Sequence, residues 1–151
     1  MQTTRDFSRL SAVLKSKGSA AALAYLNDGV PHRFSGVYRI EGDNLRNVLL
    51  FDKLHQVRPA FLEVVPMDAS FCQFVVRDGL FRTNNSSTDT RLAGHPSQGI
   101  VVSYHAVPVI DSDRALLGTL SHFDLIERSI DDAEFELLYQ AGRLMADFLP
   151  R

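Results

Sequence analysis

The sequence predicts an α+β domain in which helices pack on one face of an antiparallel sheet. Two observations lead to this fold class. Both ends of the chain carry apolar residues at helical spacing, and residues 34–52 and 103–124 each read as two β-rich segments about a polar turn. Terminal helices combined with antiparallel hairpins are typical of domains whose helices gather on one side of the sheet.

Two helices are expected before the first hairpin. Residues 4–16 carry an apolar stripe at helical spacing, with Thr4 as the expected N-cap. A second helix is predicted to begin at Ser19, which would be its N-cap, and to run through strong helix formers. It should end near Gly29, because glycine readily takes the left-handed conformation that closes a helix.

The middle of the chain follows with shorter elements. Residues 34–52 predict a hairpin about a glycine-containing turn, and residues 53–69 are expected to be irregular because two prolines interrupt them. Residues 68–79 fit a short helix that ends at a glycine, and residues 80–83 a strand. The polar segment 84–99 contains too few apolar residues to pack as an element, so a long loop is predicted there.

Residues 103–124 predict the last hairpin, which carries one histidine on each arm. If the turn sequence DSDR is symmetric, His105 lies opposite Leu120 and His122 lies opposite Ser103. Both histidines would then share one face of the sheet as diagonal neighbours. A slip of one residue would instead place them on opposite faces.

The chain is expected to close with a long amphipathic helix. Residues 129–149 place apolar side chains at spacings of three and four, with Ser129 as a cap and acidic residues in the first turn. This length corresponds to about five helical turns.

Composition narrows the classes of function. A chain of 151 residues with 45% hydrophobic and 23% charged residues suits one domain over residues 1–151. The net charge of -2 arises from mixed acidic and basic residues, so a nucleic-acid partner is not expected. The chain shows no apolar run of membrane-spanning length and no secretory h-region, so neither a membrane nor export is expected, and the predicted localisation is cytoplasmic.

One cysteine, Cys72, is present. A single cysteine cannot form an internal disulfide, and it excludes the zinc motifs that are built on cysteine pairs. Because Phe71, Phe74 and Val75 surround it in sequence, Cys72 is predicted to be a small buried hydrophobe.

The order and spacing of several short motifs resemble the GAF domain family, small ligand-binding and sensory modules of signalling proteins. No single motif is specific, but together they span roughly residues 20–149. The matching segments are SFC at 70–72, DTR at 89–91, SYHAVPV at 103–109, LLGTLSHFD at 116–124 and the closing helix.

The resemblance implies a GAF-like fold. A central antiparallel sheet of five or six strands would carry the N-terminal and C-terminal helices on one face and a loop-covered pocket on the other. No catalytic residue set, metal site or cofactor is expected. The candidate pocket residues are Cys72, Phe81, Asp89, Arg91, His95, Tyr104, His105 and His122.

Several candidates have a structural interpretation beside the functional one. Asp89 and Arg91 could orient a polar ligand, or Asp89 could cap a turn and pair with Arg91. His105 and His122 could ligate a metal only with a third or fourth ligand, and Asp124 is the one carboxylate at a matching adjacent position. The histidines are therefore interpreted as pocket-facing or as hydrogen-bonded residues of the sheet.

Three functional interpretations fit. The favoured one is a non-catalytic sensory domain that binds an unknown small-molecule ligand and forms a homodimer through its terminal helices. The second is a free methionine sulfoxide reductase that uses Cys72 with an external thiol, although that lineage has several cysteines around its pocket. The third is a regulatory dimer whose pocket is filled by side chains. The residue signatures for cyclic-nucleotide binding and bilin attachment in this family are missing from the sequence.

Overall fold

A six-stranded antiparallel sheet forms the centre of the chain, which a computed structural model describes over residues 5–149. The strands lie in the order β3-β2-β1-β6-β5-β4, and every pair is antiparallel. The α+β class and the six-stranded sheet confirm the predicted fold class. The strands are β1 Phe34–Glu41, β2 Asn44–Asp52, β3 Val64–Pro66, β4 Phe81–Thr83, β5 Ser103–Ile110 and β6 Leu116–Asp124.

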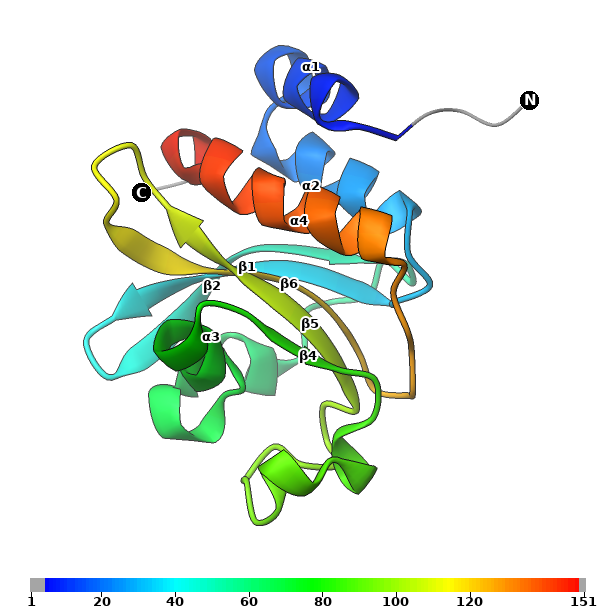
Figure 1. Ribbon diagram of the computed structural model, residues 1–151, viewed down its shortest axis with the longest axis vertical. Helices are drawn as coiled ribbons and strands as arrows, with labels where there is room; N and C mark the ends of the chain where they lie inside the picture. The colour runs from blue at the N-terminus through cyan, green and yellow to red at the C-terminus, as the bar shows by residue number, and fades with distance from the viewer. Residues whose placement is uncertain (1–4, 150–151) are drawn as a thin grey trace.

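Helices cover one face of the sheet and a short helix with loops covers the other (Figure 1). Both α2 (Ser19–Asp28) and α4 (Asp132–Leu144) pack directly on the sheet. The first helix, α1 (Phe7–Lys17), lies outside them as a further layer, and α3 (Cys72–Asp78) lies on the opposite face. Within residues 5–149, no helix is long and apolar enough to cross a membrane.

Each face of the sheet has its own hydrophobic core. The helix-facing core is mainly aliphatic and includes Leu26, Val107, Leu120 and Leu138. The opposite core is rich in aromatic rings, and its buried members include Phe34, Tyr38, Phe71, Phe81, Tyr104 and Phe123. Because side chains alternate along a strand, each of the central strands contributes to both cores.

The boundaries of the N-terminal helices follow from their caps. Asp6 is the N-cap of α1, and its side chain accepts a hydrogen bond from the backbone N–H of Arg9. The predicted cap, Thr4, lies outside the described residues. Gly18 has a φ of 93°, which a glycine adopts without strain, and it separates α1 from α2. The second helix begins at Ser19 as predicted, but Gly18 rather than Ser19 is its N-cap.

The last helix is shorter than predicted. Its N-cap is Asp131 rather than Ser129, and the α-helical hydrogen bonding ends at Leu144. The chain then tightens into a 3-10 turn at Ala146–Phe148. The apolar spacing continues through both parts, since Met145 and Leu149 are buried, so periodicity alone overestimates the length of the α-helix.

A strand within residues 53–69 corrects the prediction that this segment is irregular. The three residues of β3 pair with the first residues of β2, where Arg46 lies opposite Val64. Pro66 is tolerated because it ends a strand at the edge of the sheet. A three-residue strand is too short to show an alternating pattern.

The register of the last hairpin also corrects the prediction. His105 lies directly opposite His122, and Ser103 lies opposite Asp124, so the pairing is shifted by two residues. The turn is wider than a symmetric DSDR turn because the side chain of Asp111 accepts the N–H groups of Asp113 and Ala115. A bulge between Val109 and Ile110 adds to the shift. A shift of two preserves the face, so both histidines still share one.

A glycine in α4 allows this helix to lie very close to β5. A Cβ atom added at Gly142 would lie 2.2 Å from the carbonyl oxygen of Pro108, well inside van der Waals contact. Backbone atoms cannot move away as the end of a flexible side chain can. The close packing of α4 on the sheet therefore depends on the missing side chain.

Replacing Gly142 by alanine should destabilise the domain by about 1–3 kcal/mol, because it overpacks the contact between α4 and β5. Helix propensity alone predicts the opposite sign, a gain of about 1 kcal/mol. Urea denaturation of the wild type and Gly142→Ala measures the difference, and Arg143→Ala, on an exposed position of the same helix, is the matched control. A more stable Gly142→Ala variant would show that the close approach is not a constraint.

Candidate ligand-binding site

A small cavity lies between the aromatic face of the sheet and the segments that cover it. Its volume is about 70 Å³. Tyr38, Tyr104 and Phe123 form its floor, and the start of α3 lies on one side. The rim carries Phe61 and Ile100, which are 52% and 55% exposed. The remaining lining residues are Leu62, Val65, Ala69, Ser70, Phe71, Cys72, Ser97 and Val101.

The polar groups of this cavity are all uncharged. Cys72 Sγ lies 3.0 Å from the hydroxyl of Tyr104 and 3.1 Å from Oγ1 of Thr119. The hydroxyl of Tyr38 donates a hydrogen bond of 2.6 Å to the carbonyl of Leu62. Burial raises the pKa of both tyrosines well above the ordinary value, so their hydroxyls stay protonated. No lining residue carries a charged side chain.

The local sequence positions Cys72 at the first turn of α3. The side chain of Ser70 accepts the backbone N–H of Cys72 at 3.0 Å, although Phe71 rather than Ser70 is the N-cap of α3. Gly79 ends the helix in the left-handed conformation, as predicted. Between them, Phe71 and Val75 are buried in the aromatic core, so Cys72 is held against the sheet. The predicted burial of Cys72 is confirmed.

His95 supports the cover of the cavity without lining it. Its ring lies against Phe71, with 4.8 Å between the ring centroids. Nδ1 accepts the backbone N–H of Ser97 at 3.0 Å, and the side-chain amide of Gln73 lies 2.6 Å from Nε2. Burial lowers the pKa of His95 below its ordinary value. These contacts fix the loop that contributes Ser97 to the cavity.

Phe81, Asp89 and Arg91 form a cluster outside the cavity. The guanidinium of Arg91 binds the carboxylate of Asp89 with two hydrogen bonds of 3.0 and 2.6 Å and lies over the ring of Phe81 at 4.7 Å. Asp89 also caps a 3-10 turn by accepting the N–H of Arg91, and the hydrogen bond from the guanidinium lowers the pKa of Asp89 to about 2. Both charges are therefore engaged with each other. They border an open polar groove of about 480 Å³ that is separate from the cavity.

Of the two interpretations of His105 and His122, the structure contradicts the pocket-facing one and shows both as hydrogen-bonded residues of the sheet. The alternation of β5 places Tyr104 on the cavity side and His105 on the helix side, and His122 shares the side of His105. Both are fully buried there together with His32, which sequence reasoning missed. His32 lies in the link between α2 and β1, and no pattern in the sequence indicates that it returns to the sheet.

The three imidazoles form a polar cluster where the link between α2 and β1 meets β5 and β6. His32 Nε2 lies 2.9 Å from His105 Nδ1, and His105 Nε2 lies 2.9 Å from Oδ1 of Asn84. His122 Nδ1 lies 2.5 Å from the hydroxyl of Ser35. Burial lowers the pKa of His32 to about 4 and that of His105 to about 3, and lowers that of His122 as well. Among residues 5–149, no three His, Cys, Asp or Glu side chains are arranged to hold a metal ion.

Of the eight candidate residues, the structure brings only Cys72 and Tyr104 together at the cavity. Phe81 and His95 pack around its wall, since each has a ring close to that of Phe71. Tyr38 and Thr119 complete the polar part of the site, and sequence reasoning missed both. The sequence did point to Thr119, because this residue belongs to the GTL motif of an alternating strand. The face of the sheet on which its side chain lies could be assigned only once the strand register was known.

Comparison by sequence finds no matching protein-family model and no matching curated protein. Solved structures do match. The GAF domain of an Acinetobacter phosphoenolpyruvate-protein phosphotransferase has a TM-score of 0.72 at 14% identity, with 93% of this chain and 88% of that chain covered. The free methionine-R-sulfoxide reductase of Neisseria meningitidis, solved with its substrate, has a TM-score of 0.70 at 16% identity, covering 93% and 83%. The chromophore-binding domain of phytochrome P1 from Stigmatella aurantiaca has a TM-score of 0.72 at 10% identity, covering 95% and 58%.

Proposed function

We propose that this chain, whose fold is GAF-like, is a sensory domain that binds a small uncharged molecule in the cavity next to Cys72 and Tyr104. The observation that carries the proposal is the composition of the cavity: an apolar and aromatic lining with a few hydroxyl groups and one thiol. Binding sites for small molecules commonly combine such a lining with a few placed polar groups. The ligand would have an apolar body and one hydrogen-bonding group.

The volume of the cavity limits the size of this ligand. Pockets for drug-sized molecules enclose about 300–1,000 Å³. The cavity here measures about 70 Å³, so a molecule of a few non-hydrogen atoms fits as the site is built. A larger ligand requires the segment from Ser97 to Val101 to move outward. The exposed side chains of Phe61 and Ile100 at the rim would then cover the larger ligand.

A reductase that uses Cys72 is the second candidate. It is favoured by one observation, the presence of the thiol in the cavity lining, and by the likeness to the Neisseria enzyme. In such a reaction the thiol takes the sulfoxide oxygen and becomes a sulfenic acid while the sulfoxide becomes a thioether. Two equivalents of an external thiol then restore Cys72 and yield a disulfide and water.

The geometry supports binding over this chemistry. A free amino acid carries a carboxylate and an ammonium group, and burying either requires a partner charge or several hydrogen bonds. No lining residue of the cavity is charged. The polar side-chain neighbours of Cys72 Sγ are two hydroxyls, whereas reactive thiolates lie next to cationic groups.

We propose further that the bound state is passed on through a homodimer formed by the terminal helices. The outer helix α1 buries Leu10 and Leu14 but leaves Phe7 42% exposed, and Phe148 near the other terminus is 41% exposed. Most of the apolar face of α4 is already covered by the sheet, because Phe135, Leu138 and Ala141 are buried. The dimer surface would therefore lie on α1 rather than on α4.

Filling the cavity should abolish ligand binding while the fold persists. We expect phenol and dimethyl sulfoxide, used as uncharged probes, to shift the amide NMR signals of Ser70–Cys72 and Ser97–Val101 in the wild type. Val101→Phe should reduce these shifts at least tenfold because the new ring occupies the cavity. Val57→Phe, at a position 94% exposed, is the matched control. Equal shifts in the wild type and Val101→Phe would contradict the proposed site.

Thiol-dependent reduction of free methionine sulfoxide should be undetectable with the wild-type chain. The measurement is methionine formation in the presence of dithiothreitol, for the wild type and Cys72→Ser, with the thiol alone as the blank. Turnover that disappears in Cys72→Ser would instead establish the reductase. Turnover that is equal in both variants would point to a contaminating enzyme.

Native mass spectrometry of the purified chain should show a dimer. Phe7→Glu should convert it to a monomer, because a charge buried at an apolar interface is costly. Ile126→Glu, which alters a side chain 54% exposed in the segment after β6, should leave the dimer intact. A monomeric wild type at micromolar concentration would refute the dimer, and the same spectra report any retained ligand.

A further inference from the structure

Three of the five histidines of the chain meet on the helix-facing side of the sheet, although they come from three separate elements. His32 belongs to the link between α2 and β1, His105 to β5 and His122 to β6. The centroid of the His32 ring lies 4.9 Å from that of His105 and 5.8 Å from that of His122. All three side chains are fully buried. The cluster thus ties the α2–β1 link to two strands inside the sheet.

The hydrogen bond between His32 and His105 requires that one of its two nitrogens carries no proton. One of the two facing nitrogens must donate a proton and the other must offer a lone pair. With Oδ1 of Asn84 as the acceptor, His105 donates from Nε2 and accepts at Nδ1 from Nε2–H of His32. A proton added to Nδ1 of His105 would place two donors 2.9 Å apart. Protonation of His105 therefore breaks the contact that holds His32 in place, whereas a proton on Nδ1 of His32 would leave this hydrogen bond intact.

Charged groups around the cluster also oppose protonation. Four cationic side chains lower the pKa values of the three histidines. They are Arg5 before α1, Lys53 after β2, Arg82 in β4 and Arg128 after β6. The carboxylate that favours a charged His32 is Asp124, which already accepts the N–H of Arg33 and Nε of Arg128. On the packed helices, Asp28 of α2 acts on Lys53, and Glu134 of α4 pairs with Arg5.

The direction of the pH dependence follows from these contacts. The pKa values of His32 and His105 are about 4 and 3 in the folded chain, below the ordinary value of 6.5. An opened chain therefore binds protons that the closed chain does not, between about pH 6.5 and the folded-chain pKa values of about 4 and 3. The stabilisation of the closed form is complete above that pH and is lost progressively as the pH falls toward 4.

The α2–β1 link is the part of this cluster that can leave. β5 and β6 are each paired on both sides, so His105 and His122 are fixed by strand pairing. The link is held by individual hydrogen bonds and one ion pair rather than by strand pairing. The amide of Asn27 donates to the carbonyl of His32 at 3.1 Å, and the N–H of Lys53 donates to the carbonyl of Arg33 at 2.9 Å. The N–H of Arg33 donates to Asp124, and its guanidinium binds Asp52 with hydrogen bonds of 2.8 and 3.0 Å.

We propose that the cluster of His32, His105 and His122 is an acid-sensitive latch, which holds α2 on the sheet at neutral pH and releases α2 and residues 29–33 below about pH 6. The latch is independent of the cavity, which lies on the opposite face of the sheet. Release would expose the aliphatic surface that α2 covers, including Leu23 and Leu26. Mild acid is then a second signal to which this domain responds.

Hydrogen exchange of the full chain tests the release directly. At pH 5.5, after correction for the intrinsic rate, α2 and residues 29–33 should exchange at least tenfold faster relative to pH 7.5, while β5 and β6 stay protected. Each imidazole that gains a proton on opening shifts the opening constant by up to about tenfold per pH unit. Unchanged exchange of α2, or an equal rise in every element, would overturn the latch.

Substitution of the cluster provides the second test. His105→Gln keeps a hydrogen-bonding side chain without a titrating group, so it should reduce the pH-dependent change in α2 exchange by at least threefold. His55→Asn is the matched control, because His55 is exposed and has a φ of 51°, a conformation that asparagine tolerates. If His105→Gln does not fold, the same comparison is made with His122→Phe. A full pH response in the folded cluster variant, or its loss in His55→Asn, would refute the assignment.

Discussion

The pairing register of β5 and β6 is the constraint on which both polar sites depend. Because side chains alternate, one register places Tyr104 and Thr119 on the same face as Cys72 and places His105 opposite His122 on the other. A slip of one residue would exchange the faces, bringing an imidazole to the cavity side and a hydroxyl to the side of the helices. The chain fixes the register at the turn, where the carboxylate of Asp111 accepts the N–H groups of Asp113 and Ala115.

Much of the fold could be predicted from the sequence, because the helices and hairpins carry strong periodic patterns. The α+β class with helices on one face of an antiparallel sheet followed from these patterns, whereas the loops on the other face were implied by the GAF resemblance. The register could not be derived in the same way, since it rests on the hydrogen bonds of one side chain and a bulge beside Ile110. β3 was missed because three residues are too few to show a period.

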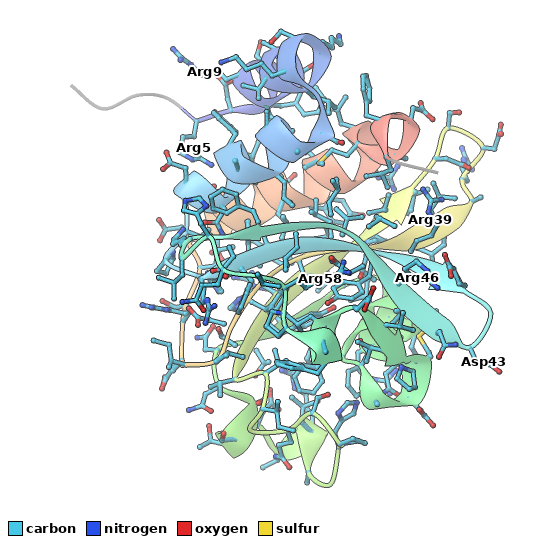
Figure 2. The ribbon with its side chains drawn as sticks, turned by 180° about the vertical axis from the view of Figure 1, so that it is seen from behind. Arg5, Arg9, Arg39, Asp43, Arg46 and Arg58 are labelled. Carbon is cyan, nitrogen blue, oxygen red and sulfur yellow. The ribbon has the colours of Figure 1, made fainter. Side chains whose placement is uncertain are left out.

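The candidate site was harder to predict than the fold. Spacing in the sequence correctly indicated that Cys72 is buried on a short helix, but it could not show that Tyr38 lines the same cavity or that Thr119 lies against Cys72. His32 follows a proline in a link without any periodic pattern, so its return to the sheet is a purely tertiary feature. Residues far apart in sequence meet in both sites. In Figure 2, Arg5 lies beside the helices, and Arg46 and Asp43 lie at the end of the β1–β2 hairpin.

The two faces of the sheet differ in how easily their polar groups exchange hydrogen-bond partners or accept a proton. On the cavity side, neutral hydroxyls and a thiol can exchange partners with a small ligand, since each can donate or accept. On the helix side, the imidazoles are fully buried and under the influence of nearby cations, and a proton added to Nδ1 of His105 breaks a contact. Tyr104 and His105 are adjacent on β5 but lie on opposite faces of the sheet, because side chains alternate along a strand. A group bound in the cavity therefore meets hydroxyls and a thiol, while the protonation chemistry of the imidazoles is confined to the side of the helices.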